Sequence, residues 1–168
     1  MALLTARLDP SVRTSLADRL GERPRILAWA RTAHGWAVGL PGTLAVQTDG
    51  EWTFQPWHEI GHGGWDAATG RLRWEDVDGG QHELVLQRAG RFPDLFNERV
   101  TSSIVFTRRV PVGRDRHATV TLRRDLGSDA GATTWRVTPG PGVDLTDAAV
   151  SEQLEAALQE ARNDFSIS

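Results

Sequence analysis

The sequence contains no cysteine and no lysine, and both absences exclude classes of chemistry. Without cysteine the chain has no disulfide bonds and no thiolate nucleophile, so it could hold zinc only through histidine and carboxylate side chains. Without lysine it cannot form a phosphate-binding loop of the G-x-x-x-x-G-K type. Arginine is therefore the only strong base present. We attribute this bias to the codon usage of a GC-rich genome rather than to phosphate recognition.

Long apolar runs are also absent. No window approaches the roughly 18 apolar residues of a transmembrane helix. Arg7 and Asp9 interrupt the first apolar stretch, which is unlike a secretory signal. The net charge is −3 with both signs interspersed, which predicts no whole-molecule attraction to nucleic acid or anionic lipid. We therefore expect a cytoplasmic protein without integral membrane association and without nucleic-acid binding.

The length of 168 residues suits one compact unit with a buried core. We expect three segments that pack together as one unit. They are an N-terminal arm and short helix (1–24, with 1–9 frayed), a barrel with a closing helix (25–103), and a three-stranded meander with a C-terminal helix (104–168). The sequence does not predict the oligomeric state.

The periodicity of apolar residues predicts an α+β fold. Asp9 as cap and Pro10 at the first position open a helix that Gly21 ends. Turn signals about ten residues apart then predict five or six antiparallel strands. A 3.6-residue period predicts a helix from Phe92 to about Ser102. After it we expect strands at 104–112, 118–124 and 133–138, and an amphipathic helix from about Asp147 to Asp164, capped by Thr146 or Asp144.

The string His58-Glu59-Ile60-Gly61-His62 matches the zinc-protease pattern literally. In that chemistry two histidines four residues apart share the metal on one face of a helix. The glutamate between them activates the bound water. A third ligand could come from Glu75 or Glu83.

The neighbouring residues favour a strand with a bulge and surface histidines over such a helix. Gly61, Gly63 and Gly64 would each cost about 1 kcal/mol in a helix interior, and Pro56 prevents an earlier helix start. In a strand the two histidines would lie about 13 Å apart, too far to share one ion. We therefore assign no catalytic, cofactor-binding or metal-binding residue, and a zinc-dependent hydrolase is kept as an alternative function.

Tryptophans and arginines supply the remaining candidate site residues. Four of the seven tryptophans are expected in the core: Trp29, Trp36, Trp74 and Trp135. Trp57 and Trp65 adjoin a glycine-rich bend and could be core residues or line an exposed groove. Six arginines gather late in the chain, at positions 108, 109, 114, 116, 123 and 124. They indicate either an anion or lipid-headgroup site or the solvated face of a hairpin neutralised by Asp115 and Asp125. The candidate interaction surface is Trp57, Trp65, Arg108 and Arg109.

The residues from Trp36 to Val100 resemble pleckstrin-homology-like (PH-like) domain proteins of high-GC bacteria. The matching stretches are TDGEWTFQPWHEI, WDAATGRLRW, VDGGQHELVL and RFPDLFNERV. The resemblance implies a small, bent antiparallel barrel capped by a helix, with a βββα extension after Val100. It implies no enzyme activity and no cofactor. The loops that bind phosphoinositides in eukaryotic relatives correspond to Ala33-His34 and Pro41-Gly42, which are not basic.

We therefore expect a non-enzymatic PH-like module that binds another protein, as an adapter does. The expected contact region is a barrel edge strand, or the groove between that edge and the closing helix. Two alternatives are kept: the zinc-dependent hydrolase, and an anion or lipid-headgroup binder that uses the late arginine cluster.

Overall fold

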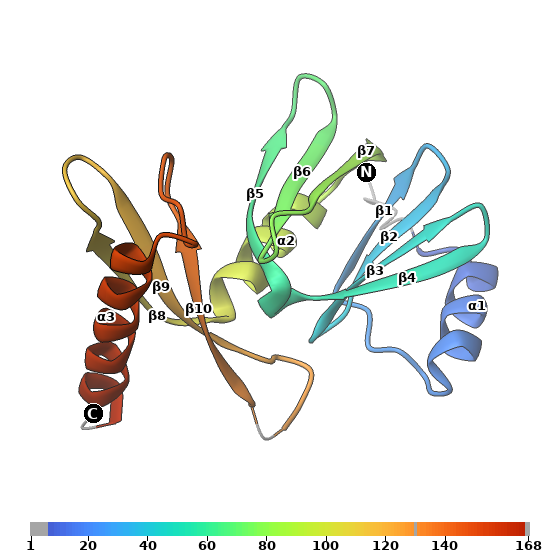
Figure 1. The fold of residues 1–168 in the computed structure, drawn as a ribbon. Coiled ribbons are helices and arrows are strands. Elements are labelled where there is room, and N and C mark those ends of the chain that lie inside the picture. The colour runs from blue at the N-terminus through green and yellow to red at the C-terminus, as the bar shows by residue number, and fades with distance from the viewer. Residues whose placement is uncertain (1–6, 130, 167–168) are drawn as a thin grey trace.

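The computed structural model describes residues 7–129 and 131–166. Over these residues the chain forms three α-helices and two antiparallel sheets (Figure 1). Helix α1 (Pro10–Leu20) precedes seven strands, α2 (Phe92–Ser102) follows them, and three more strands lead to α3 (Ala148–Ser166). The predicted order of elements is confirmed, except that the first group holds seven strands rather than five or six.

The larger sheet curls around α2 as an open half-barrel (Figure 1). Its strands are ordered β4-β3-β2-β1-β7-β6-β5, with antiparallel pairing throughout. The bounds are β1 (Ala28–Thr32), β2 (Gly35–Gly39), β3 (Thr43–Thr48), β4 (Glu51–Pro56), β5 (Ile60–Asp66), β6 (Arg71–Asp76) and β7 (Gln81–Arg88).

The connection between β4 and β5 differs from the prediction. We expected His58–His62 to lie in a strand with a bulge, but Trp57–Glu59 form a 3-10 turn, η1, and β5 begins at Ile60. Pro56 ends β4 because it has no backbone N–H to offer a further ladder bond. The indole Nε1 of Trp57 donates to the carbonyl of Leu40 at 2.8 Å, which holds the turn against the interior.

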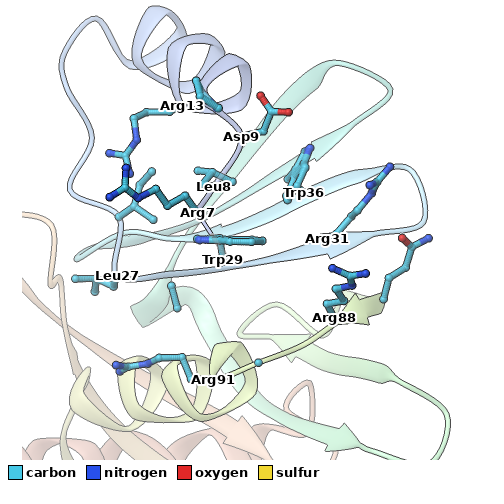
Figure 2. A pocket seen from close by; sticks show the side chains of 15 residues that line it. Arg7, Leu8, Asp9, Arg13, Leu27, Trp29, Arg31, Trp36, Arg88 and Arg91 are labelled. Atoms are coloured by element: carbon cyan, nitrogen blue, oxygen red, sulfur yellow. The ribbon is translucent and has the colours of Figure 1, made fainter. Parts of the chain in front are cut away.

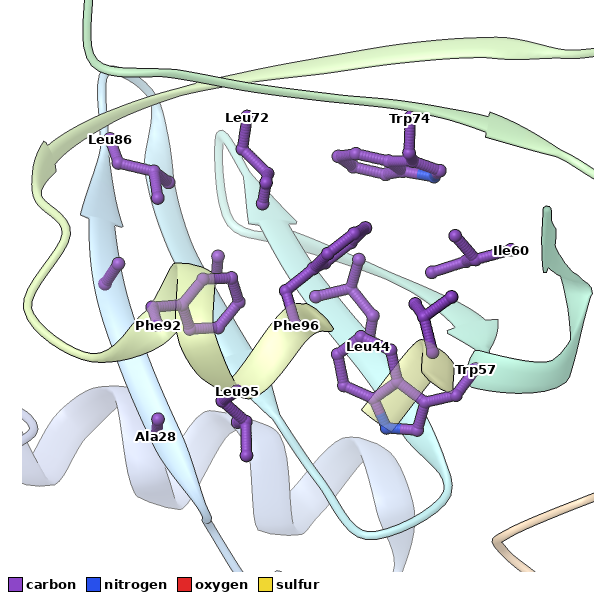
Figure 3. Close-up of a cluster of buried hydrophobic side chains, with 13 residues drawn as sticks. Ala28, Leu44, Trp57, Ile60, Leu72, Trp74, Leu86, Phe92, Leu95 and Phe96 are labelled. Atoms are coloured by element: carbon purple, nitrogen blue, oxygen red, sulfur yellow. The ribbon is translucent and has the colours of Figure 1, made fainter. Parts of the chain in front are cut away.

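The main core fills the half-barrel (Figure 3). Phe92, Leu95, Phe96 and Val100 of α2 are all buried in it, which confirms the 3.6-residue period read from the sequence. Phe96 lies at the centre, with its ring edge-on to Trp57 at a centroid distance of 5.8 Å. Burial of these large side chains against the strands is the main stabilising term for this half of the molecule.

Helix α1 covers the opposite face of the sheet, across β1–β4 (Figure 1). Its cap is as predicted, because the Asp9 carboxylate accepts hydrogen bonds from the backbone N–H and the hydroxyl of Ser11. The expectation of a frayed arm is wrong for residues 7–9, since Leu8 is only 5% exposed and packs beside Val12 and Leu16. Residues 1–6 lie outside the described part of the chain.

The second sheet has the order β10-β9-β8 and carries α3 on one face (Figure 1). Its strands are β8 (Ile104–Pro111), β9 (His117–Arg124) and β10 (Thr133–Pro139), each within one residue of the prediction at either end. Asp147 caps α3, rather than Thr146 or Asp144, by accepting from the N–H groups of Ala149 and Val150. Within residues 7–129 and 131–166 no helix is both long and apolar enough to cross a bilayer.

The two sheets meet through a close approach of backbone. A Cβ atom added to Gly42, in the β2–β3 turn, would lie 2.2 Å from the Cα of Gly127, which follows β9. No side chain fits in that space, so glycine at position 42 permits the contact. The partly buried Leu126 beside it packs against the main core.

Truncation of Trp74 tests the half-barrel. Trp74 is 5% exposed, packs against Phe96, and donates its indole N–H to Gln55. We expect Trp74→Ala to lower the free energy of unfolding by about 3–5 kcal/mol because it leaves a large cavity. In urea titrations, the control Val85→Ala at a 40% exposed position on β7 should change that free energy by less than about 0.5 kcal/mol. Equal stability of the two variants would contradict the packing described above.

Candidate functional site

The histidines of the HEIGH string do not share a helix. His58 lies on η1 and His62 on β5, and Ile60 between them has the extended backbone of a strand. The predicted strand is therefore correct from Ile60 onward and wrong for Trp57–Glu59. His62 is exposed, whereas the side chain of His58 is largely covered, with Nδ1 3.7 Å from the Asp125 carboxylate. In the described ranges, no group of three or more histidine and carboxylate side chains is placed to hold a metal ion.

The two candidate third ligands are engaged elsewhere. Glu83 forms ion pairs with Arg71 and Arg73, both at 2.6 Å. The hydrogen bond from Arg73, reinforced by the charge of Arg71, lowers the pKa of Glu83. Glu75 accepts a hydrogen bond from Gln81. Glu75 is the cross-strand partner of His62 in the β5–β6 ladder, but within the described residues no third histidine or carboxylate joins them to hold a metal ion.

The candidate interaction surface is not one surface. Trp57 is 0% exposed, so its side chain belongs to the core and cannot line an exposed groove. Trp65 is half-buried on β5 and packs against the main core. Arg108 and Arg109 lie on β8 of the other sheet. The predicted grouping fails because the bend after Pro56 turns the indole of Trp57 inward.

Arg108 and Arg109 also diverge from each other. Successive side chains of a strand point to opposite faces. Arg108 bonds to Asp164 of α3 at 2.7 Å, which raises the pKa of Arg108, while Arg109 lies 2.8 Å from Nδ1 of His117. The carboxylates that pair with Arg108 come from α3, not from Asp115 or Asp125 as the sequence suggested.

Arg123 is the largest departure from the predicted basic cluster. It is 3% exposed, and its guanidinium passes from β9 to the turn η1. Nη2 donates to the carbonyls of Trp57 at 3.1 Å and Ile60 at 2.6 Å. Burial, aided by the charge of Arg136, lowers the pKa of Arg123 to about 10. This side chain joins the two sheets and is not part of a solvated face, so the six late arginines form no single anion site.

An open groove elsewhere on the molecule gathers a different set of arginines (Figure 2). Its volume is about 1280 Å³. Three parts of the chain enclose it: the segment that opens α1, strands β1 and β2, and the connection from β7 to α2. The residues that line it are Arg7, Leu8, Asp9, Pro10, Arg13, Ile26, Leu27, Ala28, Trp29, Arg31, Trp36, Gln87, Arg88, Gly90 and Arg91. We call it the arginine groove.

The arginine groove carries five guanidinium groups and one carboxylate. Its arginines are Arg7, Arg13, Arg31, Arg88 and Arg91. None of them forms an ion pair with a carboxylate in residues 7–129 and 131–166. The Asp9 carboxylate caps α1, and its hydrogen bonds to Ser11 lower its pKa. The groove is therefore strongly positive in a chain whose net charge is −3.

Two of these arginines face each other across the sheet. Strand β1 pairs with β7 at only two positions, Arg31 with Arg88 and Thr32 with Leu86, with a register shift between them. Like charges directly opposite each other in a sheet are destabilising. An anion placed between Arg31 and Arg88 would remove that repulsion.

Two half-buried tryptophans lie among the apolar residues that line the groove. The rings of Trp29 and Trp36 meet edge to face at 5.5 Å, and the Arg31 guanidinium lies 5.7 Å from the Trp36 ring. Figure 2 shows Arg7 and Arg13 at one end of the groove and Arg31 and Arg88 at the other, with the indoles between them. Four tryptophans were expected in the core. Of these, Trp74 is buried, whereas Trp29, Trp36 and Trp135 are only half-buried.

Sequence reasoning missed the arginine groove because its arginines are scattered from residue 7 to residue 91. They come together only when β1 pairs with β7 and α1 folds over the sheet. A local signal existed in Arg88 and Arg91, which flank Ala89 and Gly90 between a strand and a helix. It carried no information about the partner segments.

Comparison of the chain with protein-family models, with curated proteins and with solved structures finds no match. The function is therefore inferred from the geometry of the chain itself.

Substitution of Arg123 tests its role between the sheets. We expect Arg123→Met to lower the free energy of unfolding by about 1–3 kcal/mol, because the buried carbonyl of Ile60 loses the guanidinium donor and that of Trp57 keeps only the backbone N–H of Ile60. The exposed neighbour Arg124→Met is the control, with an expected change below about 0.5 kcal/mol in urea titrations. If Arg123→Met instead raised the stability, the cost of burying the charge would exceed the gain from its hydrogen bonds.

Proposed function

We propose that the half-barrel and α2 form a PH-like, non-enzymatic binding module of the cytoplasm that docks another protein in the arginine groove. The observation that carries this proposal is a set of five arginines around two half-buried tryptophans, none of which pairs with a carboxylate of the residues that the structure describes. Cations gathered on one surface without counter-charges repel one another. Their concentration in one groove is explained if a ligand supplies the missing charge.

The composition of the groove is typical of protein-docking surfaces. Arginine and tryptophan are enriched among the residues that contribute most to binding between proteins. An indole offers a large contact area at small entropic cost, and a guanidinium forms two parallel hydrogen bonds with a carboxylate. Trp29 and Arg31 combine these properties on a single strand.

The shape of the groove also supports a macromolecular partner. Small-molecule sites are concave and enclose most of their ligand. The arginine groove is only partly enclosed and is lined by segments from three parts of the chain. The curled sheet with a helix inside agrees with the PH-like resemblance, but that likeness concerns fold, and function has to be argued from the site.

A comparative pull-down tests the proposal. The full chain, tagged, is incubated with lysate of its own host, and retained proteins are quantified by mass spectrometry. The triple substitution Arg7→Gln, Arg31→Gln and Arg88→Gln should reduce retention of the partner by at least about tenfold, because charge-assisted hydrogen bonds are lost.

The matched control removes the same charge from other surfaces. Arg114→Gln, Arg124→Gln and Arg162→Gln alter three exposed arginines that lie outside the groove. This variant should retain as much partner as the unmodified chain. Equal retention by the groove variant, or no retained protein at all, would refute docking in the arginine groove.

A further inference from the structure

We infer that a second cavity, inside the half-barrel, binds a small organic cation: an amine that carries an apolar group. The cavity lies between strands β3 and β4 on one side and β6 and β7 on the other, and its volume is about 590 Å³. It shares no lining residue with the arginine groove, so this site is independent of the docking function proposed above.

The walls of the cavity are the inner faces of two strand pairs. Residues directly opposite each other in an antiparallel ladder point to the same face of the sheet. Leu44 of β3 lies opposite Gln55 of β4, and Trp74 of β6 lies opposite His82 of β7. All four line the cavity. Because Leu44 and Trp74 also belong to the main core, both pairs face the inside of the half-barrel.

The base of the cavity is closed. The indole N–H of Trp74 donates to Oε1 of Gln55 at 2.8 Å and so joins the two walls. Beneath it the Trp74 ring packs against Phe96 of α2, at a centroid distance of 5.6 Å. Small-molecule sites are concave and have volumes of roughly 300–1,000 Å³. The cavity falls within that range, whereas the arginine groove, at about 1280 Å³, exceeds it.

Apolar side chains line much of the cavity. Val46 of β3 and Leu84 of β7 both pack against the main core, yet both are only half-buried because one side of each faces the cavity. An apolar group placed between them would remove this remaining surface from water, which is favourable. The ligand therefore needs an apolar part.

The charges around the cavity select a cation. Three ionisable side chains line it: Glu59, His82 and Glu83. Glu83 is paired with two arginines of β6, and His82 with Asp76. Glu59 is half-buried in η1 and forms no ion pair with any residue that the structure describes. Covering a carboxylate is unfavourable unless a cation accompanies it, so an ammonium group beside Glu59 would supply the missing charge.

This assignment gives the glutamate of the HEIGH string a role outside zinc chemistry. Glu59 is held at the cavity because η1 turns the chain between β4 and β5, and its backbone carbonyl accepts the N–H of Val77 at 2.8 Å. The carboxylate is a binding group for the ligand and takes no part in a reaction.

Phenethylamine is the probe, with phenethyl alcohol as its neutral counterpart and hydrocinnamate as its anionic counterpart. Binding to the full chain is followed by NMR, through the indole N–H of Trp74 and the methyl groups of Val46 and Leu84. We expect the amine to shift these signals saturably and to bind at least about tenfold more tightly than the alcohol, because it forms a charge-assisted hydrogen bond with Glu59. Hydrocinnamate should not bind.

Protein variants locate the two ends of the ligand. In Glu59→Gln the amine and the alcohol should bind equally. Glu98→Gln removes the same charge from an exposed position of α2 outside the cavity and should keep the full preference for the amine. Thr53→Phe places a ring in the mouth of the cavity, at an exposed position, and should weaken binding of both compounds. Thermal melts establish that each variant is folded.

Four outcomes would overturn the inference. Equal binding of amine and alcohol to the unmodified chain would reject the charged end, and a preference that persists in Glu59→Gln would place the cation elsewhere. No shift of the Trp74 signal at millimolar amine would reject the cavity as a ligand site. Tighter binding of a capped lysine amide than of phenethylamine would replace the small molecule by a side chain of a partner protein.

Amine binding and docking in the arginine groove are tested separately. The variant Arg31→Gln with Arg88→Gln should bind phenethylamine as the unmodified chain does, because neither arginine lines the cavity. Glu59→Gln should in turn retain the pull-down partner. Loss of amine binding in the arginine variant would contradict the independence of the two sites.

Discussion

One buried guanidinium fixes the arrangement of the two sheets. Arg123 leaves β9, enters the space beside η1 and donates to the carbonyls of Trp57 and Ile60. Both residues are buried, and the carbonyl of Trp57 also accepts the backbone N–H of Ile60, so Arg123 supplies a second donor to the first residue of the turn and a donor to the residue that follows it. The 3-10 turn η1 places Trp57 against Phe96 in the centre of the half-barrel. The core of one sheet therefore depends on a charged side chain from the other.

Local patterns in the sequence predicted most of the elements. Each strand of the second sheet lies within one residue of its predicted bounds, and α2 and the capped α1 begin and end as expected. These segments follow from turn residues and from the spacing of apolar side chains, which are properties of neighbouring residues. The turn η1 was missed because alternation around Trp52 and Phe54 resembles a strand that continues beyond Pro56, while the burial of Trp57 is decided by α2.

The candidate site could not be found in this way. The late arginines form a conspicuous cluster in the sequence, but strand alternation, α3 and the interior separate Arg108, Arg109 and Arg123 from one another. The arginine groove shows the opposite relation, since its members are distant in the chain and adjacent in the fold. Cross-strand pairing of β1 with β7 creates it, and such long-range pairing is not encoded in any short window.

The two-pair ladder between β1 and β7 has a mechanical consequence. It divides the half-barrel into two leaves, β4-β3-β2-β1 and β7-β6-β5, each held internally by longer ladders. A ladder of two residue pairs gives little resistance to bending between the two groups of strands. The angle between them is set by the side chains of α2, which pack against both. The curvature of the sheet therefore depends on how α2 packs against both groups of strands.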